Sequence, residues 1–400
     1  MSGPLDGIRI LDLTTVVLGP FATQLLADLG ADVIKVESPE GDNTRQLSPM
    51  RHPGMGAMYL HMNRNKRSIV LDLKQPAGRE ALLRLATKVD VLAYNTRPRA
   101  MQRLKLGYED VQAVNPGIVY VGAVGFDQSG PYAGRPAYDD LIQGAVGLPW
   151  LMMKNGAHRP RYVPATLCDR IVGQAMANAI LAALVQRSRD GNGQSVEVPM
   201  FETMAQFILG DHFGGRTFEP ARGEAGYARV LARYRAPYET KDGHICVLVY
   251  NDKQWKGFFA RIGKSDLYAS DPRFGSLAER AKNIDEVYAF VAQELRTRTT
   301  EEWERLFTEA DIPWMRMNSI DDLIDDPHLA LTGFFQQVEH PSEGAIRTPG
   351  VPTRWSNAQP LLRHPAPRLG QHSAELLREA GYSATEIAQM TRDGVTRLDG

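Results

Sequence analysis

Cysteine is scarce in this sequence. The 400 residues include only two cysteines, Cys168 and Cys246. Two cysteines cannot supply the disulfide framework of a small secreted domain, and such low use is typical of a reducing compartment. The opening residues, MSGPLDGIRILDLTT, contain two acids and no apolar signal core. We therefore expect a cytoplasmic protein.

A dominant charge and a long apolar run are also missing. The formal net charge is -1, which gives no reason to expect nucleic acid or an anionic membrane as a partner. No apolar run approaches the roughly 20 residues that a bilayer-spanning helix needs. The composition, 43% hydrophobic and 23% charged, is that of an ordinary globular protein.

Several common catalytic motifs are absent. No G-x-G-x-x-G motif follows a strand, no Walker loop occurs, and Ser129 lacks the G-x-S-x-G frame. The nine histidines are scattered without zinc-ligand spacing. Residues 321–327, DDLIDDP, lack the glycine and the twelfth-position acid of a calcium loop, so we interpret them as a solvated helix end. No metal site is predicted.

What is present in the N-terminal half is an alternation of strands and helices. Residues 8–14 and 31–37 are branched and apolar, which predicts two strands. A helix is predicted between them, with an inner face made of Phe21, Leu25 and Leu29. The alternation continues through 67–73, 77–95 and 116–126. This pattern predicts an α/β fold whose parallel sheet is covered by helices on both faces.

The sequence predicts two domains, with a boundary near Gly210. A chain of 400 residues should form two domains, because single hydrophobic cores stop growing at about 250–300 residues. Residues 210–235 are rich in glycine and arginine without a period, which indicates a linker. A hairpin turning at 241–243, followed by helical segments over 252–263 and 283–310, predicts a second unit. Two short helices are expected around Gly381.

An acid stands at the start of the longest predicted helix. Its apolar stripe consists of Ile171, Val172, Ala175, Met176, Ala179, Ile180, Ala183 and Leu184. Asp169 lies seven residues before Met176 and, at about 100° per residue, projects within about 20° of it. Asp169 could form a capping box with Thr166. Alternatively, it could be an inward-facing nucleophile that the helix dipole keeps ionised.

Three turns follow predicted strands, where open parallel sheets bind ligands. Residues 14–22 expose backbone N–H groups at a helix start, and 123–134 form another such turn. The turn between them carries Asn95, Arg97, Arg99, Arg103 and Lys105. A basic cluster is more often a solvated face, but its place after a strand favours a ligand that carries phosphates.

Longer segments match a known family pattern. The first is PLDGIRILDLTTVVLGPFATQLLADLGADVIKVESPEGDNTR, and others are NRNKRSIVLDLKQPAGREALLRL and GQSVEVPMFETM. The match resumes at PYETKDGHICVLVYNDKQWKGF and LGQHSAELLREAGY, and so covers most of the chain in order. These segments resemble the class III CoA-transferases (CaiB/BaiF), the formyl-CoA and carnitine CoA-transferase type. The resemblance implies an enzyme that moves CoA from an acyl-CoA thioester to a carboxylic acid.

The family's nucleophile is an aspartate before the long helix, and the matching residue here is Asp169. The resemblance implies a mixed anhydride between this carboxylate and the acyl group, followed by an aspartyl-CoA thioester. Such intermediates require that water be excluded from the site. The resemblance therefore favours the nucleophile over the cap.

By the same resemblance, CoA is a substrate that lies over the three turns, and no cofactor is permanently bound. Contacts through the backbone are expected from Val17 and Leu18. The adenosine end is expected to border Leu71, Asp72, Leu73 and Lys74. The pantetheine and phosphates are expected along Asn95, Thr96, Arg97 and Arg103. The thiol end is expected near Val124, Gly125, Phe126 and Asp127.

The sequence departs from the family pattern at several positions. Val17 and Thr15 stand where some members have glutamine and histidine, which argues against formyl or oxalyl substrates. The run of four glycines that covers the aspartate in formyl-CoA transferase is absent, and Gly214-Gly215 is the nearest candidate. Tyr138 replaces the histidine base of the superfamily's racemases. Because a tyrosine with a pKa of about 10 is a poor base near neutrality, racemisation is disfavoured.

Two other activities remain alternatives to CoA transfer. One is acyl-CoA racemisation or isomerisation, and the other is non-catalytic binding of acyl-CoA. If transfer is correct, a dicarboxylate such as succinate would suit Arg161, Arg170 or Arg233, provided that one of them enters the pocket.

The resemblance also implies an architecture. Family members form interlaced homodimers in which a large, doubly wound, Rossmann-like domain takes both chain ends and a smaller α+β domain lies between them. The predicted boundaries are 1–209 for the first part of the large domain, 210–235 for a linker, 236–330 for the small domain, 331–360 for a second linker and 361–400 for the rest of the large domain.

Overall fold

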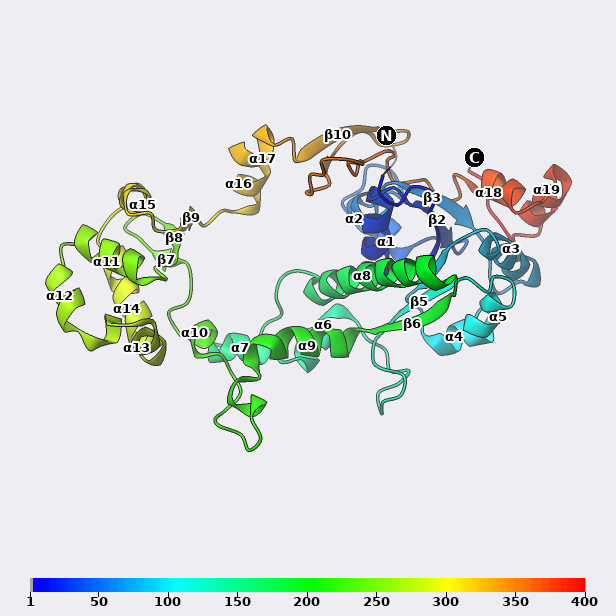
Figure 1. The fold of residues 1–400 in the computed structure, drawn as a ribbon. Coiled ribbons are helices and arrows are strands. Elements are labelled where there is room, and N and C mark those ends of the chain that lie inside the picture. The colour runs from blue at the N-terminus through cyan, green and yellow to red at the C-terminus, as the bar shows by residue number, and fades with distance from the viewer. Residues whose placement is uncertain (1–2, 400) are drawn as a thin grey trace. The chain divides into compact units, whose positions relative to one another are not determined.

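The computed structural model describes residues 3–399 (Figure 1). The chain forms two compact units. The first comprises Met1–Val146, Val163–Gln206 and Pro327–Gly400, and the second comprises Gly147–Tyr162 and Phe207–Asp326. Both ends of the chain therefore belong to the same unit.

A parallel six-stranded sheet forms the centre of the first unit. Its strands are β1 (Arg9–Leu13), β2 (Asp32–Glu37), β3 (Lys66–Val70), β4 (Val91–Tyr94), β5 (Val119–Val124) and β6 (Gln194–Pro199). The order across the sheet is β3-β2-β1-β4-β5-β6, and all neighbouring strands are parallel. The chain reverses direction across the sheet between β1 and β4, the type of position where open α/β sheets bind ligands.

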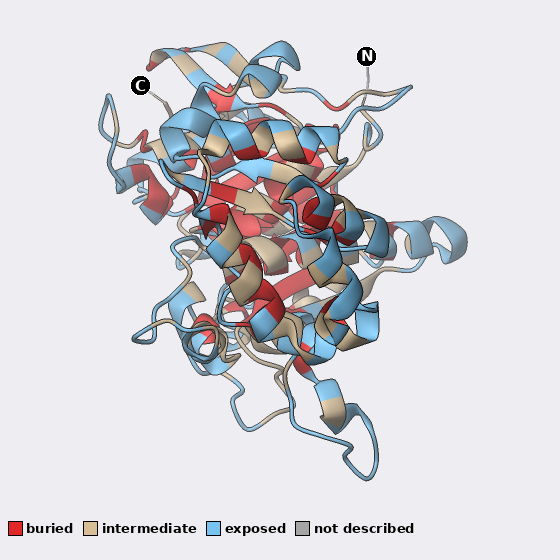
Figure 2. Ribbon diagram, turned by 90° about the vertical axis from the view of Figure 1, so that its left-hand side faces the viewer, coloured by how far each residue is buried: buried red, intermediate tan, exposed pale blue. Residues whose placement is uncertain are grey.

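Helices cover both faces of this sheet, which confirms the predicted α/β fold. Ile10 and Val33 face α1 (Leu18–Asp28) and α8 (Leu167–Asp190), whereas Leu11 and Ile34 face α3 (Pro76–Ala86), α18 (Ser373–Glu379) and α19 (Ala384–Arg392). Neighbouring residues alternate in this way because side chains of a strand point to opposite faces in turn. Buried residues, red in Figure 2, concentrate along the strands.

The remaining elements of the first unit connect or flank this sheet. They are the 3₁₀ helix Asn43–Gln46, α2 (Ala57–Met62), α4 (Pro98–Arg103), α5 (Tyr108–Gln112), α6 (Asp139–Ala145), α17 (Pro327–Leu331), β10 (Phe335–His340) and β11 (Gly344–Pro349). Helix α9 (Met200–His212) begins in the first unit, and its residues from Phe207 on belong to the second. The two short helices expected around Gly381 are α18 and α19, and they pack beside β3 and α3.

The predicted inner face of α1 is wrong. Phe21 and Leu25 are only partly buried, whereas Leu26 is fully buried. The buried face also includes Thr23 and Asp28, which are polar. Their hydrogen bonds to buried charged groups stabilise them there, so a pattern based on apolar residues assigned the wrong side.

Helix α8 packs along the sheet and α1. Its buried residues are Cys168, Val172, Gly173, Met176, Ala177, Ile180, Ala183 and Leu184. This confirms much of the predicted stripe, although Ile171, Ala175 and Ala179 are only partly buried. At the far end of the helix, the Arg187 guanidinium pairs with Asp90 and donates to the Gly117 carbonyl at 3.2 Å.

One correction concerns apolar length. We expected no segment that reaches the length of a membrane span. By length and composition alone, however, the 24-residue α8 is long and apolar enough to cross a membrane. The helix reaches this composition because many of its side chains pack in the protein core.

The second unit combines a small sheet with helices. It contains α7 (Leu148–Lys154), the 3₁₀ helix Gly214–Thr217, α10 (Ala228–Leu231), β7 (Tyr238–Glu239), β8 (His244–Val247), α11 (Asp252–Arg261), α12 (Ser265–Ser270), the 3₁₀ helix Pro272–Phe274, α13 (Leu277–Lys282), α14 (Ile284–Leu295), α15 (Thr300–Glu309), β9 (Trp314–Arg316) and α16 (Ile320–Ile324). Strands β7 and β8 are antiparallel, which confirms the hairpin at 241–243. Aromatic side chains, including Trp255, Phe258 and Trp303, form its core.

The unit boundaries differ from the predicted ones at two segments. Residues 147–162 belong to the second unit, where the Asn155 amide donates to the carbonyls of Val230 and Ala232 at 3.2 and 2.8 Å. Residues 331–360, predicted as a linker, contain the antiparallel β10–β11 hairpin of the first unit. Both features depend on contacts between residues far apart in sequence, which local composition does not reveal.

Candidate active site

A cavity of about 330 Å³ lies in the first unit beyond the carboxyl ends of β1, β4 and β5. The chain therefore builds a cavity beside the switch point of its sheet, as open α/β sheets commonly do. Its lining residues come from the turns after these strands, from the start of α8 and from neighbouring segments. They are Thr15, Val16, Val17, Leu18, Asn43, Asn95, Thr96, Arg97, Pro98, Ala123, Val124, Gly125, Gln128, Gly134, Arg135, Pro136, Ala137, Tyr138, Asp169 and Met200.

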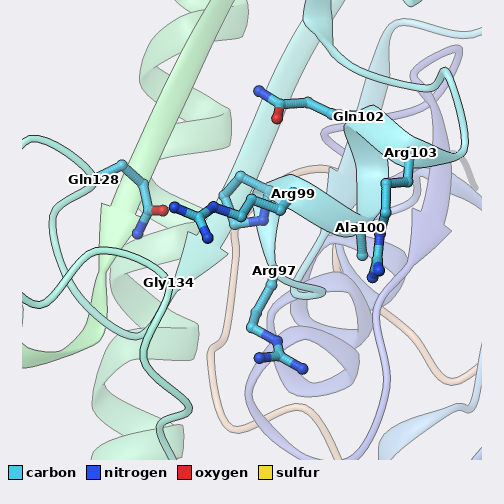
Figure 3. Close-up of a pocket in the computed structure, with 8 residues that line it drawn as sticks. Arg97, Arg99, Ala100, Gln102, Arg103, Gln128 and Gly134 are labelled. Carbon is cyan, nitrogen blue, oxygen red and sulfur yellow. The ribbon is translucent and has the colours of Figure 1, made fainter.

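A second cavity of about 600 Å³ adjoins the first, and the two share Arg97, Pro98, Gln128 and Gly134. Arg97 precedes α4, Arg99 lies in its first turn and Arg103 is its last residue. The Arg99 side chain reaches toward Gln128 (Figure 3). Within residues 3–399, none of these three arginines forms a salt bridge. Because one guanidinium group can donate two parallel hydrogen bonds to a phosphate, this cavity suits a phosphate-bearing ligand.

Asp169 occupies the first turn of α8 and is half-buried. Its backbone N–H donates to the Oδ1 atom of Asp139 at 3.0 Å, and Thr166 makes no side-chain cap. The predicted capping box with Thr166 is therefore wrong, because Asp139, distant in sequence, supplies the cap. In the part of the chain that the structure describes, the Asp169 carboxylate makes no hydrogen bond.

The surroundings of Asp169 favour the neutral form of its carboxyl. Burial raises its pKa to about 7, and the nearby Asp139 carboxylate adds to this, while Arg170 opposes it. The group therefore gains or loses its proton near neutrality. The helix dipole, which we expected to keep it ionised, acts in the opposite direction to burial.

Asp139 belongs to a small network that holds the start of α8. Its Oδ2 atom accepts a hydrogen bond from the Gln143 amide at 2.6 Å. The Gln143 Oε1 atom in turn accepts the backbone N–H of Val163 at 2.8 Å. Gln143 is fully buried, so this network fixes the segment that leads into Asp169.

Close packing of α8 against α1 brings Asp169 beside the first turn of α1. A Cβ atom on Gly173 would lie 2.7 Å from the Leu18 carbonyl oxygen, which is too close for any side chain. Glycine at this position therefore allows the two helices to approach each other. The nucleophile candidate and the N–H groups at the start of α1 consequently border one cavity.

Cys168, next to Asp169, is a poor candidate for a nucleophile. The Cys168 thiol is fully buried, and burial together with Asp139 raises its pKa to about 12. Because a thiol must ionise to attack, Cys168 cannot compete with the carboxylate near neutral pH.

The structure brings many of the predicted site residues together. Val17, Leu18, Asn95, Thr96, Arg97, Val124, Gly125 and Asp169 line the first cavity, and Arg103 lines the second. The side-chain amide of Asn95 is already engaged, because it accepts the Thr15 N–H at 2.9 Å and donates to the Thr15 carbonyl at 2.8 Å. Asn95 therefore shapes the cavity wall through the loop after β1.

Other predicted residues lie outside the two linings. Phe126 packs against Tyr132 and Phe201, and the Asp127 carboxylate accepts the backbone N–H of Ser129. Residues 71–74 follow the edge strand β3, separated from β4 by β2 and β1. Leu71 is buried in the core, and the Asp72 carboxylate accepts the N–H of Lys74 at 3.1 Å.

Sequence reasoning missed the contribution of residues 134–139. Gly134 has a φ of 75°, and the segment that follows lines the cavity as far as Tyr138. The only local signal was a turn rich in glycine and proline, which does not reveal where its end returns. The role of Asp139 could not be predicted either, because it depends on a contact with Asp169, which is 30 residues away in the sequence.

Of the three arginines considered for binding a dicarboxylate, only Arg170 lies in the same unit as Asp169. Its guanidinium lies 4.6 Å from the centroid of the Phe21 ring. Arg161 and Arg233 belong to the second unit. Among residues 3–399, no group of three or more His, Cys, Asp or Glu side chains is arranged to hold a metal ion.

Comparison with known families gives a match over nearly the whole chain. The model of CoA-transferase family III matches residues 5–373. A human protein named succinyl-CoA:glutarate CoA-transferase is 31% identical over 398 residues, which cover 98% of this chain and 90% of the relative. A formyl-CoA:oxalate CoA-transferase of Escherichia coli O157:H7 is 32% identical, with 98% of this chain and 99% of the relative covered.

Comparison with solved structures agrees. The crystal structure of Rv3272 from M. tuberculosis matches with a TM-score of 0.80 and 30% identity. The match covers 93% of this chain and 99% of that protein. The similarity therefore extends over both compact units.

Proposed function

The chain belongs to CoA-transferase family III, and we propose that it transfers CoA between carboxylic acids by covalent catalysis at Asp169. The observation that carries this proposal is the position of Asp169. Its half-buried carboxylate, free of hydrogen bonds within residues 3–399, lines a cavity that adjoins an arginine-rich cavity. A nucleophile and a phosphate-binding surface are the two parts that an acyl-CoA requires.

In the first half of the reaction, an ionised Asp169 oxygen attacks the carbonyl carbon of the acyl-CoA thioester. The carbon–sulfur bond breaks, CoA leaves as a thiolate, and a mixed anhydride joins the acyl group to Asp169. The thiolate then attacks the Asp169 carbonyl carbon. This step releases the donor acid and leaves an aspartyl-CoA thioester.

In the second half, the carboxylate of the acceptor acid attacks the aspartyl-CoA carbonyl carbon. The thiolate leaves again and a second anhydride forms. Attack of the thiolate on the acceptor acyl carbon gives the new acyl-CoA and restores the Asp169 carboxylate. No net proton is consumed, so the enzyme needs an ionised Asp169 and a site that excludes water.

The surroundings of Asp169 support these steps. Leu18, the first residue of α1, lines the cavity, and its backbone N–H has no partner within the helix. This N–H can stabilise the negative oxygen that develops when a carbonyl is attacked. Arg97, Arg99 and Arg103 would hold the phosphates of CoA in the adjoining cavity.

We further propose that the acid exchanged is a dicarboxylate such as succinate. The human relative is named for succinyl-CoA, the thioester of the dicarboxylate succinate, and for the dicarboxylate glutarate. Arg170 is half-buried next to Asp169 and makes no salt bridge within the described residues, but it lies outside both cavity linings. The proposal of a dicarboxylate therefore rests on the named relative.

The assembly that we propose is an interlaced homodimer in the cytoplasm. Both chain ends belong to one unit and the second unit lies between them in sequence, which is the domain order that the family resemblance implies. Size-exclusion chromatography with light scattering should give the mass of a dimer. A monomer at micromolar concentration would contradict this assembly.

Trapping of the intermediate tests the function. Protein incubated with succinyl-CoA and then treated with hydroxylamine should carry a hydroxamate on Asp169, detected by mass spectrometry of peptides. Asp169→Ala should abolish both the label and the transfer of CoA to a panel of dicarboxylic acids. Asp190→Asn, a change at an exposed acid at the other end of α8, is the matched control and should retain both. Full activity in Asp169→Ala would falsify the proposal.

A further inference from the structure

The loop between β1 and α1 contains a residue in an unfavourable conformation. Val16 has a φ of 70°, in the left-handed region, although it is β-branched. Such a backbone conformation persists only when the surrounding structure holds it, and it often occurs at functional sites. Residues 15–18 of this loop line the cavity that contains Asp169.

A buried ion pair between Lys35 and Asp42 forms hydrogen bonds with the backbone of this loop. The Lys35 Nζ atom donates to the Thr14 carbonyl at 3.0 Å and to the Asp42 Oδ2 atom at 2.9 Å. The Asp42 carboxylate accepts the Val16 N–H at 3.3 Å. Both charged side chains are fully buried, so the pair is anchored to the loop on either side of Thr15.

The Asp42 carboxylate is itself fixed in place. Its Oδ1 atom accepts the backbone N–H and the hydroxyl of Thr44 at 2.9 and 2.7 Å. The Asp42 backbone N–H donates to the Glu37 Oε2 atom at 3.0 Å. The group that holds Val16 is therefore rigid rather than a mobile surface charge.

Stability alone is a weak explanation for this arrangement. Burying two charges removes them from water, and a buried ion pair often adds little stability compared with apolar side chains of the same volume. Here each partner also makes a hydrogen bond to the backbone of the loop. This use of both charges indicates a role in shaping the loop.

We infer that Lys35 and Asp42 are positioning residues that hold residues 14–17 in the conformation required for binding acyl-CoA. Neither side chain lines the cavity itself, and Asp42 acts on the lining through its hydrogen bond with Val16. By fixing Val16, the pair determines the direction in which the chain enters α1. It therefore orients the backbone N–H of Leu18, the first residue of α1, at the cavity. This inference rests on the proposed function.

The experiment combines a loss with a rescue. Asp42→Asn keeps an oxygen for Thr44 but removes the charge that pairs with Lys35. We expect the Kd of the full-length protein for succinyl-CoA, measured by titration calorimetry, to rise about tenfold, the scale of one lost interaction. Adding Val16→Gly should recover most of the affinity, because glycine adopts a positive φ without strain.

A matched control separates positioning from stability. Asp28→Asn breaks another buried ion pair of the same unit, with Arg64, away from the cavity. It should lower the melting temperature and leave the Kd unchanged. Asp42→Asn should also lower the melting temperature. In the double variant Val16→Gly/Asp42→Asn, the affinity for succinyl-CoA should recover while the melting temperature remains as low as in Asp42→Asn. A purely structural role of Asp42 would make the two quantities change together.

Each outcome has a distinct meaning. If the wild type does not bind succinyl-CoA or free CoA, the proposed function fails. If it binds, and Asp42→Asn binds equally well, the positioning role is wrong. Should Asp42→Asn not fold, Thr44→Val removes one hydrogen bond to Asp42 and keeps the ion pair. A smaller loss of affinity, rescued by Val16→Gly, then supports the inference, and unchanged affinity overturns it.

Discussion

The backbone N–H of Asp169 donates to the side chain of Asp139 at 3.0 Å, so the proposed nucleophile is held by a second carboxylate. This contact has two effects. It fixes the first turn of α8, and it places a negative charge where it raises the pKa of Asp169, which burial has already raised, to about 7. The charge of the nucleophile is thereby coupled to pH in the range where enzymes usually work.

The first prediction is a pH dependence of transfer. Because only the ionised carboxylate attacks, kcat/KM should rise with pH and level off above about 7, falling roughly tenfold per unit on the acid side. Asp139→Asn removes a negative charge, so the half-maximal pH should move toward acid. Initial rates between about pH 5 and 9 with saturating acceptor acid would measure this.

The Asp139 variant carries its own control. An asparagine at 139 loses the acceptor for the Gln143 amide, so some loss of rate at all pH values is expected. Gln143→Glu changes the same network one step away from Asp169 and serves as comparison. An unchanged half-maximal pH in Asp139→Asn contradicts the electrostatic role of Asp139.

The second prediction concerns stability. The pKa of Asp169 is raised from its usual 3.8 to about 7 in the folded protein, so the folded state binds the proton more tightly than the unfolded state. The free energy of unfolding therefore falls as pH rises between these values. Asp169→Asn removes this loss and should stabilise the protein above pH 7 by at most about 4 kcal/mol, and by less to the extent that solvent screens the half-buried carboxyl.

Urea unfolding of the wild type and Asp169→Asn at pH 5 and 8 checks this prediction. The difference in unfolding free energy should be smaller at the lower pH. A variant that is less stable than the wild type at pH 8 would show that the ionised carboxylate has a stabilising partner. In that case the pKa would be lowered rather than raised.

The third prediction concerns the approach of α8 to α1. Gly173→Ala places a Cβ atom 2.7 Å from the Leu18 carbonyl oxygen, so the helices must separate. Overpacking of this kind costs about 1–3 kcal/mol, and displacement of Asp169 should lower kcat about tenfold or more. Unfolding free energies and steady-state rates are the measurements.

Gly144→Ala is the matched control for this change, since both glycines are helical but a Cβ at 144 meets nothing within 4 Å. That variant should gain about 0.5–1 kcal/mol from helix propensity and keep its kcat. Equal behaviour of the two alanine variants would mean that the close approach at Gly173 is unimportant.

The fourth prediction concerns the arginine-rich cavity. Replacing Arg97, Arg99 or Arg103 with methionine should raise the KM for acyl-CoA about tenfold while kcat changes little, because the phosphates lie far from the reacting carbonyl. The effect should shrink at high salt. For at least one of the three variants, it should disappear with a dephospho-CoA thioester.

Arg84→Met offers a control for loss of surface charge. Arg84 is exposed on α3 and pairs with Glu80, outside both cavity linings. The KM of the Arg84→Met variant for acyl-CoA should equal that of the wild type. If all three cavity variants also keep the wild-type KM, CoA binds elsewhere on the protein.

The sequence allowed the fold class to be predicted because strands and helices of the first unit have regular spacing. Ile10 and Leu11, for example, face opposite covered sides of one parallel sheet. The prediction failed where burial depends on polar partners. Thr23 and Asp28 are buried because charged groups from distant segments bond to them, so α1 presents a different face from the expected one.

The site was predictable only in part for the same reason. Val17, Arg97 and Gly125 follow strands directly, so their position at one edge of the sheet could be inferred. Resemblance to a family singled out Asp169, while its local sequence equally fitted a helix cap. Asp139 and the segment before it depend on how a long connection folds back, and no local pattern encodes that path.

The cavity wall and the proposed nucleophile belong to different kinds of structure. Asp169 belongs to a long helix braced along the sheet and tied at its far end by Arg187, whereas the wall consists of connections between strands and helices. Connections tolerate substitution better than packed helices do. Substitutions in these connections are therefore expected to alter which acid is accepted, while the position of the proposed nucleophile stays constant.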